Sequence, residues 1–244
     1  MMPVRRILGV PCMAFASTDE AVDVVRDLVR LGTGGYNVAI NAEKVMIARR
    51  DPQVARIIDE AALPSPDGSG AQIGLRWVHG VRTVKIDMPR TALRVAHENA
   101  FRVFLLGAAP DVIGRTLERV RRDFSGAEIV GSHHGFFDDD AAMIERLRAA
   151  TPDLVLVAMG SPRQEIFARQ ALDAGVQAVF IGCGGAFNIL AGTVRRAPVA
   201  WQRAHLEWFY RLLQDPRRWQ RVLGLAPFFL RLAQEAIVHR IRRS

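Results

Sequence analysis

The chain has 244 residues, of which 50% are hydrophobic and 24% are charged, and it contains two cysteines, Cys12 and Cys183. This composition excludes a disordered or fibrous protein, and two cysteines cannot build a disulfide scaffold, which favours a reducing compartment. No apolar run approaches the roughly 18 residues of a membrane-spanning helix, and the first residues make no convincing signal peptide. The sequence therefore predicts a soluble or peripheral globular protein.

Short β-rich runs alternate with amphipathic helical patterns along most of the chain. The expected strands are Tyr36–Ile40, Arg102–Leu106, Glu128–Gly131, Asp153–Ala158 and Ala178–Ile181. The expected helices are Ala21–Arg30, Pro89–Asn99, Asp111–Phe124, Ala141–Ala149 and Pro162–Ala174. Because this alternation is typical of parallel sheets, we expect an α/β fold with a Rossmann-like, mostly parallel sheet and helices on both faces.

The loops after four of these strands each open with glycine, at Gly107, Gly131, Gly160 and Gly182. Ligands of parallel sheets bind at the carboxyl ends of the strands. Glycine there lets backbone N–H groups approach a ligand, and a helix N-terminus favours phosphate. The alternative is that glycine only makes the turns. Four such loops at one edge favour a nucleotide site.

Other chemistries have weaker support in the sequence. No G-x-G-x-x-G follows the expected strands and no Walker phosphate loop occurs, which disfavours a dinucleotide oxidoreductase. His133 and His134, with Asp138–Asp140 nearby, lack a second cluster to complete a metal shell, so we expect neither a metal nor a cofactor. Cys183 lies in a glycine-rich loop without a neighbouring base, which disfavours a nucleophilic role.

The net charge of +8 is concentrated in the last fifth of the chain. Residues 195–244 contain 11 arginines and only three acidic residues, so the first 194 residues are neutral. Three of the four tryptophans also lie in this tail. We therefore expect a catalytic-type body over residues 1–194 and a basic helical appendage over 195–244. Nucleic acid, anionic lipid or a pyrophosphate substrate would suit such an appendage, although the charge is also typical of a solvated helical face.

Two apolar stripes at helical spacing run along the appendage. The first consists of Leu206, Phe209, Tyr210 and Leu213. The second follows Leu225 and consists of Phe228, Phe229, Leu232 and Ala236. Basic helices of this kind suit an anionic membrane surface, whereas the alternative is that the stripes pack on the body. A nucleic-acid adaptor is the rival from another functional class, because arginine-rich aromatic segments also bind phosphate backbones.

A series of short motifs gives the chain a family resemblance. In chain order they are Ile40–Lys44, Pro66–Gly68, Val103–Gly107, Gly131–Phe137, Val157–Glu165, Gly184–Phe187, Arg195–Pro198 and Leu206–Arg218. Together they resemble the WecG/TagA/CpsF glycosyltransferase family over about residues 5–225. The most specific part is GSPRQE combined with EWFYRLL at this separation.

The resemblance implies inverting, metal-independent transfer of a sugar from a UDP donor to an undecaprenyl-diphosphate-linked saccharide. It further implies a Rossmann-like body and a C-terminal appendage that docks to the membrane and completes the active site. Such an enzyme would work in cell-surface polysaccharide biosynthesis, bound peripherally to the cytoplasmic face of the bacterial inner membrane. The motifs look most like the N-acetylmannosaminuronate branch, while N-acetylmannosamine and glucose donors remain open. No nucleic-acid partner is then expected, and a homo-oligomer is left open.

The resemblance also assigns catalytic roles. Inverting transfer needs a base for the acceptor hydroxyl and charge stabilisation for the departing diphosphate. Asp67 matches the family's proposed base, although Pro-Asp-Gly after a helix is by itself an ordinary turn sequence. The other matching residues are Gln164, Asn41, Arg82, Arg211, Arg218 and Arg221. The last three match arginines that the family places over the diphosphate, where a guanidinium fork fits phosphate oxygens.

For the donor we expect UDP to lie across the loops of Gly107, Gly135–Phe136 and Gly184–Asn188. The uracil would lie near Phe136 and Asn188, because the Asn188 amide offers both a donor and an acceptor. Asparagine also caps helices or supports turns without any ligand. The expected donor site is completed by Gly160, Arg163 and Gly185.

Two positions depart from the family pattern. Ala39 stands where wall-teichoic-acid members often have threonine, and Lys85 stands where many members have glycine. A lysine cannot replace a glycine that lets backbone approach a ligand. These departures concern sugar and acceptor specificity more than the class of reaction.

Overall fold

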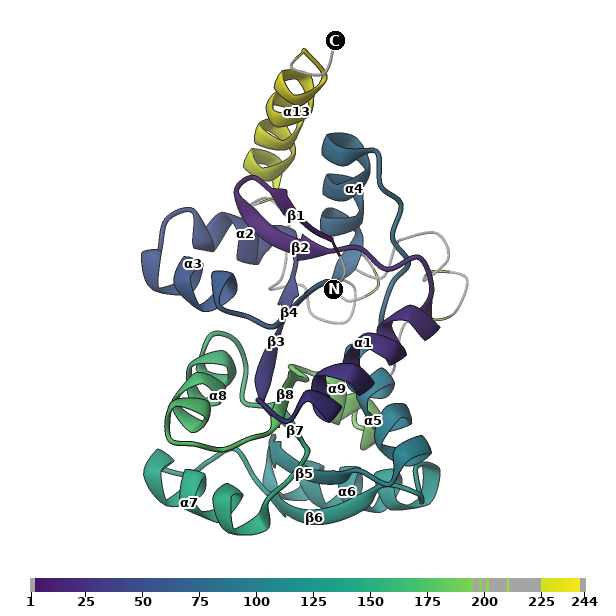
Figure 1. Cartoon of the computed structure of the whole chain (residues 1–244), viewed down its shortest axis with the longest axis vertical. Coiled ribbons are helices and arrows are strands. Elements are labelled where there is room, and N and C mark those ends of the chain that lie inside the picture. The colour runs from purple at the N-terminus through teal and green to yellow at the C-terminus, as the bar shows by residue number, and fades with distance from the viewer. Residues whose placement is uncertain (1–2, 195–197, 199–200, 202–209, 211–224, 242–244) are drawn as a thin grey trace.

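A six-stranded sheet organises the computed structural model, which describes residues 3–194, 198, 201, 210 and 225–241 (Figure 1). Its strand order is β4-β3-β8-β7-β5-β6, and all neighbouring pairs are parallel. The strands are β3 (Gly35–Ile40), β4 (Leu63–Pro66), β5 (Arg102–Gly107), β6 (Glu128–His133), β7 (Leu154–Ala158) and β8 (Val179–Gly182). The five predicted strands are confirmed, with ends displaced by at most two residues.

Helices cover both faces of this sheet, as predicted. The helices of the described residues are α1 (Thr18–Leu31), α2 (Ala42–Ala48), α3 (Pro52–Asp59), α4 (Gly68–His79), α5 (Met88–Asn99), α6 (Pro110–Asp123), α7 (Asp140–Ala150), α8 (Arg163–Asp173), α9 (Ala186–Leu190) and α13 (Ala226–Ile241), of which α13 packs on α4 and α2. One core joins α1, α5, α6 and α9 to strand residues such as Leu105 and Ile181. The other joins α2, α3, α7 and α8 to Phe104 and Phe180. Successive strand residues point to opposite faces, so β5, β7 and β8 each supply both cores.

An antiparallel hairpin, β1 (Val4–Ile7) and β2 (Val10–Met13), lies outside the main sheet. Its turn residues Leu8 and Gly9 have positive φ angles of 51° and 86°, which two-residue hairpin turns of the favoured twist require. Leucine rarely takes this conformation, so the sequence gives little sign of the turn. In Figure 1 the hairpin lies above the sheet, beside α3 and α4.

Strand β4 and helix α4 correct the prediction at Asp67, which follows a strand rather than a helix. β4 has the sequence LPSP and lies at the edge of the sheet. Its two prolines lower the β-propensity of the segment, so the sequence does not predict a strand there. Helix α4 begins GSG and contains three glycines, which weaken its helical signal. Two of these glycines allow close packing, since a Cβ at Gly70 would lie 2.8 Å from the Ala42 Cβ and one at Gly74 would lie 2.8 Å from the Ile7 Cγ2.

Helix α13 confirms the helical spacing predicted after Leu225, but its stripe does not face outward. Phe228, Leu232 and Ala236 are buried in the core formed with α2 and α4, and the fully buried Phe228 is among the largest side chains there. The Glu235 carboxylate accepts a hydrogen bond of 2.8 Å from the backbone N–H of Leu8. The expectation that this stripe lies on a membrane is therefore wrong, because α4 already covers it.

The opposite side of α13 carries exposed apolar side chains, which are Leu230, Ile237, Val238 and Ile241. Of the other predicted stripe, Leu206, Phe209 and Leu213 lie outside the described residues. In the described part of the chain, no helix combines the length and the apolar character needed to cross a bilayer.

Replacing Phe228 with alanine should lower the free energy of unfolding by about 3–5 kcal/mol, because it empties a fully buried aromatic site between α13 and α4. Urea denaturation followed by circular dichroism measures this. The matched control is Leu230→Ala on the exposed side of the same helix, which should change stability by less than about 0.5 kcal/mol. Equal effects of the two variants would contradict the packing described here.

Candidate active site

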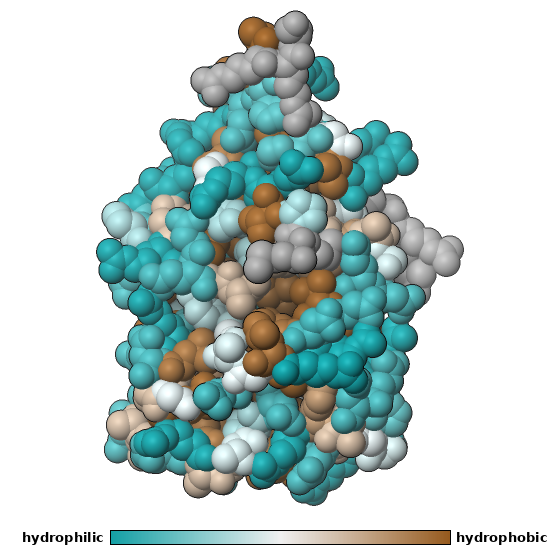
Figure 2. Space-filling view, in the orientation of Figure 1, coloured by the Kyte–Doolittle hydropathy of each residue, from teal (hydrophilic) through white to brown (hydrophobic). Residues whose placement is uncertain are grey.

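The sheet topology marks one crevice at the carboxyl edge. From β5 the chain continues through α6 on one face, whereas from β7 it continues through α8 on the other. β5 and β7 are neighbours, so their carboxyl ends form a topological switch point, where ligands of open α/β sheets bind. In Figure 2 apolar side chains, in brown, reach the surface at mid-height of the molecule, between mainly hydrophilic regions above and below.

Asn41 and Asp67 lie side by side at this edge, directly after the adjacent strands β3 and β4. The backbone N–H of Asp67 donates to the Ile40 carbonyl at 2.8 Å, which extends the parallel pairing by one residue. Asn41 caps α2, and its Oδ1 accepts from the Lys44 N–H at 2.9 Å. Asp67 occupies the N-cap position of α4 and is exposed, yet its carboxylate makes no capping hydrogen bond. Aspartate normally caps such a position, so this carboxylate is left for other chemistry.

Backbone contacts join the loops after β5 and β6. The Ala108 N–H donates to the Ala158 carbonyl at 2.9 Å, and the Gly135 N–H donates to the Ala108 carbonyl at 2.9 Å. Gly107 has a φ of 124°, and a Cβ there would lie 2.5 Å from the Ala158 backbone. Gly107 and Gly135 are thus brought together as predicted, and the close approach of neighbouring backbone alone explains both glycines.

The glycines at the ends of β7 and β8 differ from this pair. At Gly160, Gly184 and Gly185 a Cβ would meet no described atom within 4 Å. Open space beside these backbones is what a ligand approaching the edge would need. Two further glycines correct the loop prediction: Gly131 lies inside β6, where the Phe104 ring fills the side-chain space, and Gly182 ends β8 under Gln164.

An aromatic and a guanidinium group stand at the β6 end of the edge. Phe136 is 71% exposed, although large aromatic side chains are usually covered. The Arg163 guanidinium donates to the Phe137 carbonyl at 3.1 Å and lies over the Phe137 ring, 5.4 Å from its centroid. Asn188, on α9, accepts from the Thr193 hydroxyl through its backbone carbonyl at 3.0 Å and its side-chain Oδ1 at 3.3 Å.

Gln164 is buried rather than presented at the open edge. It lies in the first turn of α8 beside Glu165, which forms a buried ion pair with Lys44 of α2. Lys44 and Glu165 belong to the sequence motifs, but no catalytic or binding role is predicted for them from the sequence. The only sequence signal for this pair is that each family motif, Ile40–Lys44 and Val157–Glu165, ends in a charged residue.

The arginines are placed unequally. Arg82 is exposed on the segment between α4 and α5. The next residue, Thr83, fixes this segment to Phe15: its hydroxyl accepts from the Phe15 N–H at 2.9 Å and donates to the Phe15 carbonyl at 3.2 Å. Arg211, Arg218 and Arg221 lie outside the described residues. Lys85, the departure from the family glycine, is exposed on the same segment as Arg82.

Both thiols are buried and poorly suited to nucleophilic chemistry. Burial raises the pKa of Cys12 to about 12. Burial, together with the nearby negative charge of Asp87, raises the pKa of Cys183 well above its ordinary value. At neutral pH both side chains are therefore neutral thiols, which are weak nucleophiles.

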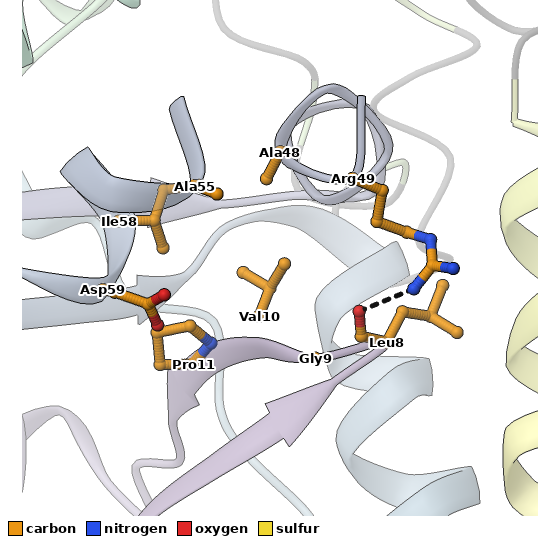
Figure 3. A pocket seen from close by; sticks show the side chains of 9 residues that line it. All are labelled: Leu8, Gly9, Val10, Pro11, Ala48, Arg49, Ala55, Ile58 and Asp59. Carbon is orange, nitrogen blue, oxygen red and sulfur yellow. Dashed lines mark hydrogen bonds between the residues drawn. The ribbon is translucent and has the colours of Figure 1, made fainter. Parts of the chain in front are cut away.

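One pocket lies away from this edge, between the hairpin turn and helices α2 and α3 (Figure 3). Its lining is mainly apolar, and the Arg49 guanidinium closes one end by donating to the Leu8 carbonyl at 3.0 Å. It contains none of the predicted site residues. Within residues 3–194 and the described part of the tail, no three His, Cys, Asp or Glu side chains are grouped to bind a metal.

Comparison with known proteins identifies a family and a curated relative with a named activity. The sequence profile of the glycosyl transferase WecG/TagA/CpsF family matches residues 5–242. An N-acetylglucosaminyldiphosphoundecaprenol N-acetyl-beta-D-mannosaminyltransferase from Bacillus spizizenii is 37% identical over 198 residues, which cover 80% of this chain and 77% of that protein.

The two kinds of glycine predict different responses to alanine. Gly107→Ala should lower stability by about 2–4 kcal/mol, because the new Cβ meets the Ala158 backbone at an unfavourable φ. Gly185→Ala should leave stability within about 0.5 kcal/mol of wild type. If a ligand lies against Gly185, the same variant should nevertheless weaken UDP binding. Thermal melts and calorimetry measure both effects, and a stable Gly107→Ala protein would contradict the close approach of β5 and β7.

Proposed function

Because this chain belongs to the WecG/TagA/CpsF family of glycosyltransferases, we propose that it moves an N-acetylmannosamine-type or N-acetylmannosaminuronate sugar from UDP to an undecaprenyl-diphosphate-linked saccharide. The acceptor class follows the activity named for the Bacillus spizizenii relative. One observation carries the proposal: the exposed Asp67 carboxylate stands uncapped at the parallel edge, next to Asn41. The product would enter cell-surface polysaccharide biosynthesis. UDP-glucose is the alternative donor.

In the proposed reaction, a hydroxyl of the acceptor sugar attacks the anomeric carbon of the donor. Asp67 takes the hydroxyl proton as the new C–O bond forms, and the bond to the UDP oxygen breaks on the opposite side with inversion. UDP then leaves with the electron pair of that bond. Helices α2, α4, α8 and α9 all begin at this edge, and their N-termini favour the negative diphosphate. Arg211, Arg218 and Arg221 are proposed to add the charge stabilisation that no metal supplies.

For the donor, we place UDP across the ends of β5, β6 and β8. The open backbones of Gly160, Gly184 and Gly185 and the exposed ring of Phe136 support this arrangement. A flat aromatic surface suits stacking of a pyrimidine. Calorimetry with UDP and with NAD tests the nucleotide class, and binding of NAD without UDP would overturn the proposal.

Replacement of Asp67 by asparagine keeps the size of the side chain but removes the base. The turnover rate should fall by roughly 10²–10⁴-fold, whereas UDP binding should stay nearly normal. Transfer is assayed with a UDP-sugar panel and a short-chain prenyl-diphosphate acceptor in the presence of EDTA. Asp51→Asn is the matched control, because Asp51 caps α3 through its side chain. If the Asp67→Asn variant turns over at the wild-type rate, Asp67 is not the base and has only a structural role in the turn.

We further propose that the chain binds peripherally to the cytoplasmic face of the bacterial inner membrane through residues 195–244. The 11 arginines of this segment and the exposed apolar side of α13 support the proposal, because basic helices with apolar faces bind anionic bilayers. The buried side of α13 ties this segment to the body through α4.

Changing Leu230, Ile237 and Ile241 together to serine should reduce sedimentation with anionic liposomes while the melting temperature stays unchanged. The control is Leu31→Ser, an equally exposed leucine on α1. Alanine variants of Arg211, Arg218 and Arg221 should instead lower transfer more than liposome binding. Full-length protein that ignores liposomes but binds RNA with steep salt dependence would favour the adaptor alternative.

A further inference from the structure

A buried ion pair joins two helices that begin at the candidate active site. Lys44 is in the first turn of α2, after β3, and Glu165 is in the first turn of α8, after β7. Their side chains are 10% and 3% exposed, and the Lys44 Nζ lies 2.7 Å from the Glu165 Oε1. Strand β8 lies between β3 and β7, so the pair spans the end of that strand. Burying two charges costs free energy that surface pairs do not, which calls for a reason beyond helix packing.

Gln164, the residue before Glu165, is held by the same carboxylate. Its Nε2 donates to the Glu165 Oε1 at 3.3 Å. Gly182 at the end of β8 provides the space, since a Cβ there would lie 2.5 Å from this Nε2. The amide nitrogen of Gln164 is therefore turned toward the pair.

The oxygen of the Gln164 amide, unlike its nitrogen, has no hydrogen-bond partner in the described part of the chain. This atom, Oε1, is buried, and the Glu165 Oε2 is likewise buried and without a partner among the described residues. Buried acceptors without donors are uncommon in folded proteins. An ionised carboxylate can only accept hydrogen bonds, so it can hold Gln164 by the nitrogen and never by the oxygen. The arrangement leaves the carbonyl oxygen of Gln164 as a buried acceptor without a donor among the described residues.

We propose that Lys44 and Glu165 are positioning residues that act through Gln164, fixing its amide so that Oε1 accepts a hydrogen bond from a hydroxyl or N–H group of the bound sugar substrate. This proposal rests on the proposed function. Lys44 and Glu165 are buried and paired with each other, and in this proposal neither of them touches the substrate. Their effect is to present an acceptor rather than a donor, which selects sugars that carry a hydrogen-bond donor at this point.

The test is a double-mutant cycle on transfer kinetics. Lys44→Met should lower kcat by about 10- to 100-fold, the cost of a misplaced group near the reacting atoms, with the KM for the UDP-sugar little changed. In a Gln164→Ala background the same substitution should lower kcat by less than about threefold, because the residue through which it acts is gone. The matched control is Arg169→Met on the same helix α8. Arg169 pairs with the surface residues Glu60 and Asp173, and its replacement should leave both constants unchanged.

A second variant separates positioning from folding. Lys44→Met combined with Glu165→Met replaces both charges by apolar side chains, which leaves no lone buried charge and should preserve the melting temperature. We expect this variant to lose kcat as Lys44→Met does. Normal kcat in the folded double variant, or additive losses in the cycle, would overturn the positioning role while leaving the proposed function intact. A wild-type chain that transfers no sugar from UDP would instead overturn the proposed function and this inference with it.

Discussion

The parallel pairing of six strands is the constraint on which the candidate site depends. The carboxyl ends of parallel strands all lie at one edge of the sheet. Strand pairing alone therefore brings residues from distant parts of the chain together there, without direct side-chain contacts between them. Asp67 and Asn41 are neighbours because β4 pairs with β3, and the hydrogen bond from Asp67 to Ile40 fixes their relative height. Parallel pairing of β5 with β7 likewise brings the loops after these strands together, and Gly107 allows their backbones to come into contact. A shift of register would separate these groups.

Electrostatics at this edge follows from the helices that begin there. Helices α2, α4, α8 and α9 begin beside the strand ends, and helix N-termini favour anions such as a diphosphate. Asp67 adds a negative charge that caps no helix, and Asn41 has its oxygen committed to the cap of α2. The edge thus combines helix N-termini with a separate exposed carboxylate. The inverting transfer that we propose needs both, the first for a departing anion and the second for a proton.

The sequence predicted the five strands that form short β-rich apolar runs, four of them followed or ended by glycine, and it predicted most helices whose stripes are amphipathic. It did not predict β4, because proline weakens the strand signal, or α4, because Gly70 and Gly74 serve packing against Ala42 and Ile7 rather than helix propensity. Of the site, the pairing of Asn41 with Asp67 follows once the parallel sheet is known. The Lys44–Glu165 pair joins residues 121 positions apart, so no local pattern reveals it. Which side of α13 is buried likewise depends on α4, since both sides carry apolar residues.

The proposed function depends on binding of the UDP donor at the carboxyl edge of the sheet. The most direct measurement is a crystal structure of the full chain grown with UDP. We expect the nucleotide across the ends of β5, β6 and β8, with its diphosphate toward Gly184 and Gly185. Nucleotide bound instead in the pocket between the hairpin and helices α2 and α3, or anywhere else off the carboxyl edge, would contradict it.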